Sequence, residues 1–307
     1  RGSSERALRK DAELNHVHWA TNRRRDIPSL MALAIDHRSQ LEDLAQGDAA
    51  VLARIPAFKA LAVQAAVQVA EGRPGFGMLL DDKYGRDALF AAGAEQDFWI
   101  ARPIELPGSR PLQFEFSQDV GSRLVDWPVD HCIKVLCFYH PDDAAELKQV
   151  QIEKLRVAYD AARKIGRDLL IEIIAGKHGA LNDDTVARAL TEIYDAKIKP
   201  DWWKLETQAS AAAWEAIDSV IETRDPWCRG VLLLGLEAPH AVLEVAFAAA
   251  QASRTVKGFA VGRTIFAEAA RGWLAGETTD EEAVADMARR FGALVAVWER
   301  LETGKAK

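Results

Sequence analysis

A lysine stands in the apolar stretch KIKPDWWKLET, residues 197–207. If residues 201–206 form a strand, side chains alternate between its faces, and Lys204 shares one face with Trp202 and Glu206. Removing a lysine from water favours its neutral amine and lowers its pKa, and a second cation nearby lowers it further. A neutral amine attacks ketones to give a Schiff base, which acts as an electron sink. Lys204 is therefore a candidate catalytic residue.

A second lysine, Lys134, lies in the apolar run CIKVLCFY, residues 132–139. If both runs belong to one barrel, the two lysines can point into its interior near the same rim. The alternative is structural, because buried charges are usually paired. In that case the lysines form ordinary ion pairs with Glu172 and Asp36 at the strand ends. The spacing alone does not separate the two interpretations.

A cation and two glycines follow the last apolar runs of the chain. Arg263 and Gly262 lie in VGRTIF, at the start of a helical pattern, and Gly235 ends the run GVLLLG. Helix N-termini with a nearby cation bind phosphate, and glycine lets backbone approach such a group. We expect a phosphate site here. Arg38 and Arg102, which also follow apolar runs, are candidates for binding a substrate carboxylate.

Histidines offer a different chemistry. His140, His178 and His240 each follow an apolar run, and three such residues could bind a divalent metal ion, as in metal-dependent aldolases. No local HxxxH pair is present, and each histidine also suits a turn or helix cap. Our primary prediction therefore contains neither a metal nor another cofactor. His37, beside Asp36, is a candidate substrate contact.

The elements that must position these residues are short apolar runs separated by helical patterns. Such alternation predicts a parallel sheet with crossover helices, and eight units predict a TIM (β/α)8 barrel, whose active site lies at the carboxyl ends of the strands. An open doubly wound sheet is the alternative. The eight runs are residues 30–36, 76–82, 98–106, 132–139, 168–174, 201–206, 230–235 and 258–263.

The predicted organisation is a linker and N-terminal helix over residues 1–27, followed by one barrel domain over residues 28–303. An irregular insertion, residues 106–128, follows the third run. The tail, residues 278–302, reads as an amphipathic helix that closes the barrel or meets a partner subunit, and we expect a homo-oligomer.

Composition excludes several classes of protein. The 307 residues are 49% hydrophobic and 28% charged, as in globular domains, and the net charge of −7 argues against non-specific nucleic-acid binding. The three cysteines form no CxxC pair, as expected in a reducing compartment. We recognise no signal peptide and no apolar run of membrane length, so we predict a cytoplasmic protein with no membrane partner.

Six segments, in order, resemble the motifs of the tagatose-1,6-bisphosphate aldolase group of class I aldolases. They are MALAIDHRSQL, GMLLDDKYGRDAL, CIKVLCFYHPDD, LLIEII, DWWKLE and VGRTIF, which span about residues 30 to 270. The resemblance implies that Lys204 forms the Schiff base and that Asp36, Lys134 and Glu172 are its charged neighbours. It also implies that Arg263 binds phosphate.

A closer resemblance is to the aldolase-like domain (DUF2090) fused to the C-terminus of some bacterial 5-dehydro-2-deoxygluconokinases of myo-inositol catabolism. ALAIDHRSQLEDLA and DWWKLE carry it, together with the linker-like start, and a covalently fused sugar kinase is the partner it implies. No sugar-kinase nucleotide motif is seen in these residues. The family's DQRG reads DHRS here, and the seventh run ends in GLEAP instead of small hydroxyl residues. The loops that recognise substrate therefore differ from those of the tagatose enzymes.

The resulting hypothesis is a lyase that cleaves a phosphorylated keto sugar acid. The implied reaction converts 6-phospho-5-dehydro-2-deoxy-D-gluconate to dihydroxyacetone phosphate and malonate semialdehyde, with Glu172 or Asp36 as the base. Lys134 is expected to keep the Lys204 amine neutral by repulsion. The alternatives are another barrel enzyme, such as a decarboxylase or a metal-dependent aldolase, and a sugar-phosphate-binding domain that regulates an attached kinase.

Overall fold

The computed structural model describes residues 13–95, 97–116 and 118–305, and its sheet is a closed barrel. Eight parallel strands pair in chain order, and β8 pairs with β1. This closure confirms the predicted TIM (β/α)8 barrel and excludes the open doubly wound sheet. The strands are β1 (Leu30–Ala34), β2 (Phe76–Leu79), β3 (Trp99–Pro103), β4 (Cys132–Cys137), β5 (Leu169–Ile173), β6 (Trp202–Leu205), β7 (Gly230–Leu233) and β8 (Val256–Val261).

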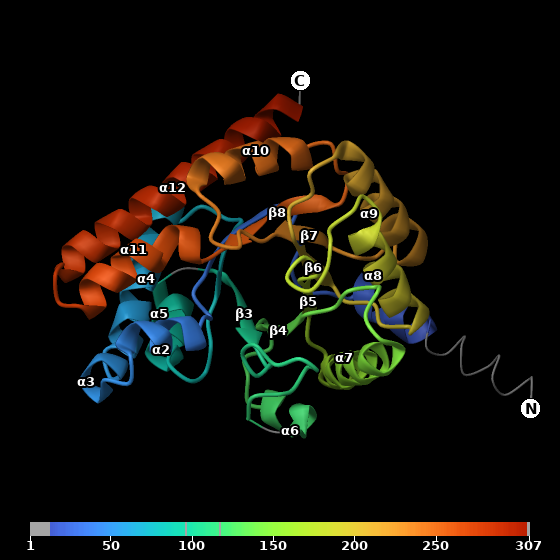
Figure 1. Cartoon of the computed structure of the whole chain (residues 1–307), viewed down its shortest axis with the longest axis horizontal. Coiled ribbons are helices and arrows are strands. Elements are labelled where there is room, and N and C mark those ends of the chain that lie inside the picture. Colours follow the sequence, from blue (N-terminus) through green and yellow to red (C-terminus); the bar gives the residue numbers. More distant parts are fainter. Residues whose placement is uncertain (1–12, 96, 117, 306–307) are drawn as a thin grey trace, which may run out of the picture.

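Helices surround the strands (Figure 1). The connection from β3 to β4 holds only the short helix α6, within the predicted irregular insertion. The helices are α2 (Ser39–Ala45), α3 (Ala49–Leu52), α4 (Ile55–Ala70), α5 (Arg86–Glu95), α6 (Val120–Leu124), α7 (Ala145–Ile165), α8 (Thr185–Asp195), α9 (Ala211–Arg224), α10 (His240–Ala250), α11 (Arg263–Leu274) and α12 (Asp280–Lys305).

Alternation along the strands divides the buried side chains into two cores. Leu30, Ala32 and Ala34 of β1 belong to an inner cluster, whereas Met31 and Leu33 pack in the larger core beneath the helices. The inner cluster also holds two tryptophans from β3 and β6, whose rings meet edge to face at 6.1 Å. The lower part of the lumen is therefore a packed core, and space for a ligand lies above it.

The tail of the chain forms α12, which packs against α4, α10 and α11 (Figure 1). Its buried Phe291 and Trp298 contact the ring of Phe259 on β8 edge to face. Burial of each such side chain contributes about 1.5–3 kcal/mol. The apolar face of this helix packs in the outer layer of the barrel, which agrees with the first of its two predicted roles, and the contact with a partner subunit stays a prediction.

The segment Ala49–Ala70 corrects one sequence-based statement. It is long and apolar enough to cross a membrane by length and composition, although we predicted no run of that kind. Within it, α4 buries Phe58, Ala62 and Ala66 completely, and the helix packs against α12 and α5. A helix in the outer layer of a barrel accounts for this apolar composition.

The amino-terminal helical segment, residues 13–21, is bonded to the barrel. The indole of Trp19 donates to Asp201 Oδ1 over 2.8 Å, and His16 lies 2.8 Å from Asp225 Oδ1. The rest of the predicted linker, residues 1–12, lies outside the described residues. Segment 13–21 therefore covers the amino-terminal end of the strands, opposite the end where we expect chemistry.

Candidate active site

A cavity of about 720 Å³ opens at the carboxyl ends of the strands. This volume suits a small-molecule site. Its wall combines apolar residues with a dense set of charged or titratable side chains, contributed by strand ends and the loops that follow them. The latter are Asp36, His37, Arg38, Glu105, Lys134, Glu172, Lys177, Lys204, Glu206, Glu237 and Arg263.

Lys204 and Glu172 are register partners on adjacent strands, so their side chains lie next to each other on the inner face of the sheet. Lys204 Nζ is 3.0 Å from Glu172 Oε1, and the lysine side chain is only 6% exposed. Among the described residues, Glu172 is the one carboxylate within ion-pair distance of Lys204. Burial alone would raise the pKa of Glu172, but Lys134 and Lys204 outweigh it and lower that pKa. Glu172 is therefore ionised at neutral pH.

Lys134 is surrounded by three carboxylates. Its Nζ is 3.0 Å from Asp36 Oδ2, 2.8 Å from Glu105 Oε1 and 3.0 Å from Glu172 Oε2. Burial favours the neutral amine, but these carboxylates outweigh it and raise the pKa of Lys134 well above its usual range. The ion pairs expected if the two lysines have a structural role are thus present. Since three anions offset its charge, Lys134 is better suited to orient these carboxylates than to repel a proton from Lys204.

Asp36 completes the floor of the cavity. Burial would raise its pKa, but Lys134 and then His37 outweigh it, so the pKa of Asp36 lies well below its usual range. Glu105, which sequence reasoning missed, follows β3. Alternation along the strand could have predicted it: side chains 101, 103 and 105 point to the same face, and Ala101 belongs to the inner cluster.

Two arginines expected to bind a carboxylate have other partners. Arg38 lines the cavity, but it is buried and its guanidinium donates to Glu105 and Glu115. Arg102 does not line the cavity: it bonds Asp82 and lies over the ring of Trp127, at 4.0 Å. It neighbours the inward Ala101 on β3, so its side chain takes the opposite, outer face. The structure therefore leaves neither arginine in position to meet a substrate carboxylate directly.

The predicted phosphate end is assembled from β7, β8 and α11. Gly235, Gly262 and Arg263 line the cavity, and Arg263 forms an ion pair of 2.6 Å with Glu237 at the surface. A Cβ atom on Gly262 would lie 2.6 Å from the carbonyl oxygen of Ala34 and would collide with the His37 ring, so only glycine fits there. α11 begins at Arg263, so its amino-terminus lies at this end of the cavity.

His37 lies at the same end, with its ring edge-on to Phe266. Burial lowers the pKa of His37 to about 3, and this outweighs the attraction of Asp36. The imidazole is therefore neutral at physiological pH, and it can offer a hydrogen bond to a ligand without adding charge. Its place on the cavity wall agrees with the expected substrate contact.

Glu206 and Lys177 also reach the cavity, although sequence reasoning gave them no role. Glu206 is buried and accepts hydrogen bonds from the amides of Ala175 and Gly176, at 2.8 and 3.1 Å. Burial raises the pKa of Glu206 despite these two donors. The carboxyl therefore fixes the start of the β5–α8 loop, which carries Lys177.

The histidines of the metal alternative do not converge. His140 Nε2 lies 3.0 Å from the Ala180 carbonyl oxygen, His178 packs edge-on against Phe138, and His240 begins α10. Within the described ranges, no group of three or more His, Cys, Asp or Glu residues could hold a metal ion. The donor geometry of this part of the chain therefore gives the metal alternative no support.

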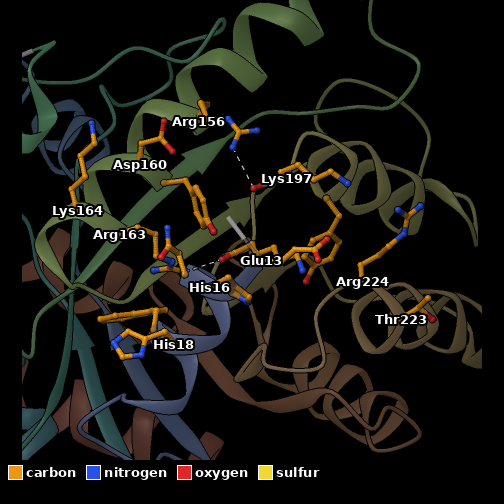
Figure 2. Close-up of a pocket in the computed structure, with 15 residues that line it drawn as sticks. Glu13, His16, His18, Arg156, Asp160, Arg163, Lys164, Lys197, Thr223 and Arg224 are labelled. Atoms are coloured by element: carbon orange, nitrogen blue, oxygen red, sulfur yellow. Dashed lines mark hydrogen bonds between the residues drawn. The ribbon is translucent and has the colours of Figure 1, made fainter. Parts of the chain in front are cut away.

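A second cavity, of about 690 Å³, lies at the amino-terminal end of the strands (Figure 2). It is lined by segment 13–21 and by the ends of α7, α8 and α9, and Arg156 there donates to the carbonyl of Lys197. Arg163, Lys164 and Arg224 occupy last helical turns, where cations complement the partial negative charge of helix C-termini. The fold thus accounts for these cations without a ligand.

Comparisons with known proteins agree with this architecture. Residues 1–302 match the family described as "Uncharacterized protein conserved in bacteria (DUF2090)". A search of curated proteins gave no match. Among solved structures, Cgl0159 from Corynebacterium glutamicum is similar with 20% identity and a TM-score of 0.58, over 96% of this chain and 97% of that one.

A fructose-bisphosphate aldolase from Plasmodium falciparum, solved with TRAP and a small-molecule inhibitor, is also similar. The two sequences are 10% identical and the two structures have a TM-score of 0.65, over 94% of this chain and 95% of the aldolase chain. At these identities, both structures support the fold alone.

Proposed function

This chain belongs to the DUF2090 family, and we propose that it is a class I aldolase that cleaves a phosphorylated keto sugar acid through a Schiff base on Lys204. One observation carries the proposal: Lys204 is a buried lysine on the inner face of β6, under an open cavity, with its Nζ 3.0 Å from an ionised carboxylate. A nucleophilic amine and a base within hydrogen-bond reach are what Schiff-base chemistry requires.

The substrate we propose is 6-phospho-5-dehydro-2-deoxy-D-gluconate. The Lys204 amine attacks the C5 ketone, water leaves, and a protonated imine forms. Glu172 then takes the proton of the C3 hydroxyl, the C3–C4 bond breaks, and its electron pair moves toward the imine nitrogen as an enamine. Malonate semialdehyde departs. Protonation at C4 and hydrolysis by one water release dihydroxyacetone phosphate and regenerate the lysine.

The surrounding residues have supporting roles in this proposal. Glu172 is favoured over Asp36 as the base because it contacts Lys204, whereas Asp36 contacts Lys134. Lys134 orients both carboxylates. Arg263, with backbone near Gly235 and Gly262, binds the phosphate, and the Arg263–Glu237 pair opens to do so. The chemistry as written uses no metal and no cofactor. An attached sugar kinase and a homo-oligomeric assembly remain proposals of the same kind.

Borohydride trapping tests the assignment. The protein is incubated with saturating dihydroxyacetone phosphate, reduced and digested, and the modified peptide is identified by mass spectrometry. We expect a stable adduct on Lys204 that is absent from Lys204→Met and present in Lys164→Met, a control at the exposed end of α7. Saturable binding of the ketone without any adduct would overturn the aldolase and favour the regulatory sugar-phosphate-binding alternative.

A further inference from the structure

We propose that Lys177, above the apolar wall of the cavity, binds a second anionic group of the substrate: a carboxylate at the end of an unhydroxylated carbon chain. This inference rests on the proposed function and specifies the aldehyde half of the substrate. Lys177 lies on the β5–α8 loop and is exposed at the mouth of the cavity.

The cations of the cavity differ in their partners. Five lysine or arginine side chains line it, and four of them pair with carboxylates: Arg38, Lys134, Lys204 and Arg263. Over the described ranges, Lys177 has no carboxylate within ion-pair distance. A substrate anion that approaches Lys177 therefore displaces no described carboxylate, whereas at Arg38 it would have to replace the buried Glu105 and the partly buried Glu115.

An aromatic ring holds the Lys177 ammonium at the mouth. Its Nζ lies 4.5 Å from the ring centroid of Phe138, and the same ring makes a T-shaped contact with the ring of His178. A cation over a ring face keeps N–H donors on its other side. The loop itself is anchored below by Glu206, and Gly176 leaves room for this contact, because a Cβ there would lie 2.8 Å from Glu206 Oε1. Lys177 is thus a positioned donor.

The wall below Lys177 is apolar. Phe138, Ile174 and Leu234 form a separate buried cluster at the carboxyl ends of β4, β5 and β7, and all three line the cavity. Hydroxyl groups placed against this cluster would lose their hydrogen bonds to water, whereas a methylene group would not. The combination of apolar wall and terminal cation fits a CH₂–COO⁻ fragment.

The order of strands around the rim places this site relative to the chemistry. Lys177 follows β5, Lys204 is on β6 and Arg263 follows β8, so Lys204 stands between the two anion-binding ends. A substrate with phosphate at Arg263 and carboxylate at Lys177 crosses over Lys204. Its ketone lies on the phosphate side and its aldehyde-forming carbon on the carboxylate side.

The test uses the synthetic direction, in which the enzyme with bound dihydroxyacetone phosphate condenses with an aldehyde. Malonate semialdehyde is compared with propanal, which has the same carbon chain without the charge. We expect wild type to prefer the charged aldehyde by roughly 10–100-fold in kcat/KM, the range of a charge-assisted hydrogen bond. We expect Lys177→Met to reduce this ratio to within about threefold, and Lys177→Arg and Lys164→Met to retain it.

The outcomes separate this inference from the proposed function. An adduct on Lys204 with equal use of both aldehydes, or a preference unchanged in Lys177→Met, would overturn the Lys177 assignment and leave the Schiff base intact. Failure of wild type to form any adduct would instead overturn the proposed function itself. Because the readout is a ratio within each variant, partial loss of folded protein does not affect it.

Discussion

Two buried ionic clusters lie at opposite ends of β6, one around Asp201 just before the strand and the other around Lys204 near its end. Asp201 is completely buried, with Trp19 and Arg23 on Oδ1 and with Arg163 and the Leu169 amide on Oδ2. Both of its oxygens are satisfied by protein donors, so this cluster leaves no valence for a ligand.

The Lys204 cluster is built differently. Lys134 resembles Asp201, because it is paired with three carboxylates: Asp36 and Glu105 accept hydrogen bonds from its Nζ, and Glu172 lies within ion-pair distance. Among the described residues, Lys204 has one carboxylate partner, and it faces an open cavity. The comparison teaches that burial of charge does not identify a reactive group, since both ends of β6 bury charge. Incomplete pairing under a cavity distinguishes the end to which we assign the proposed chemistry from the end that holds segments together.

Replacing the base should have the largest effect. In Glu172→Gln, the side chain keeps its size but no longer accepts a proton, so we expect kcat to fall by roughly 10²–10⁴-fold. Steady-state cleavage of the phosphorylated keto acid measures this. Asp36→Asn is the comparison, and its loss should be smaller, because Asp36 contacts Lys134 and not Lys204. A larger loss in Asp36→Asn would make Asp36 the base.

Substitutions in the Asp201 cluster should lower the stability of the fold and leave adduct formation on Lys204 intact. Asp201→Asn leaves two buried arginine contacts uncompensated, so we expect the free energy of unfolding to fall by about 3–5 kcal/mol. Asp195→Asn, which breaks the exposed pair with Arg224, should cost about 0–1 kcal/mol. Urea unfolding measures both. The folded Asp201→Asn protein should still form the Lys204 adduct, and loss of that adduct would contradict the separation of the two clusters.

Lowering the pH should weaken the same Asp201 cluster, with a smaller loss of unfolding free energy than the substitution. Burial would raise the pKa of Asp201, but Arg163 and Arg23 outweigh it and lower this pKa to about 2. Since the pKa in the unfolded chain is about 3.9, the stabilisation is fully present above that pH and is lost as pH falls toward about 2. We expect wild type to lose about 2–3 kcal/mol over this range relative to Asp201→Asn. Urea unfolding between about pH 4 and about pH 2 measures this. An equal loss of unfolding free energy in wild type and in Asp201→Asn would contradict the prediction.

The sequence predicted the strands and the inward lysines well, because alternation and charge together determine direction. In WWKL alternation places Lys204 on one face with Trp202, whereas the pairing of Glu172 with Lys204 comes from the register of β5 against β6. The barrel follows from eight apolar runs separated by helical patterns. These features depend on residues that are close in the sequence, so a single sequence is enough to predict them.

Other parts of the site depend on contacts between distant segments. In WIARP both faces are apolar, so parity did not show that Arg102 points outward. Arg38 is paired with Glu105, which follows β3, and with Glu115 from the insertion 106–128, and no local pattern predicts that pairing. Lys177 lies on a loop, where alternation gives no direction. The role that we propose for Lys177 rests instead on the partners of the other cations.

The smallest predicted effect tests how much segment 13–21 contributes to the Asp201 cluster. Trp19→Phe keeps most of the ring but removes the 2.8 Å hydrogen bond from Nε1 to Asp201. The two arginines and the Leu169 amide remain, so we expect a loss of about 1 kcal/mol in unfolding free energy. Thermal unfolding of Trp19→Phe, Asp201→Ala and the double variant measures the coupling, because alanine, unlike asparagine, leaves Trp19 no acceptor. Because the hydrogen bond cannot be lost twice, the double variant should be less destabilised than the sum of the single variants. Full additivity would mean that Trp19 stabilises the barrel through packing alone.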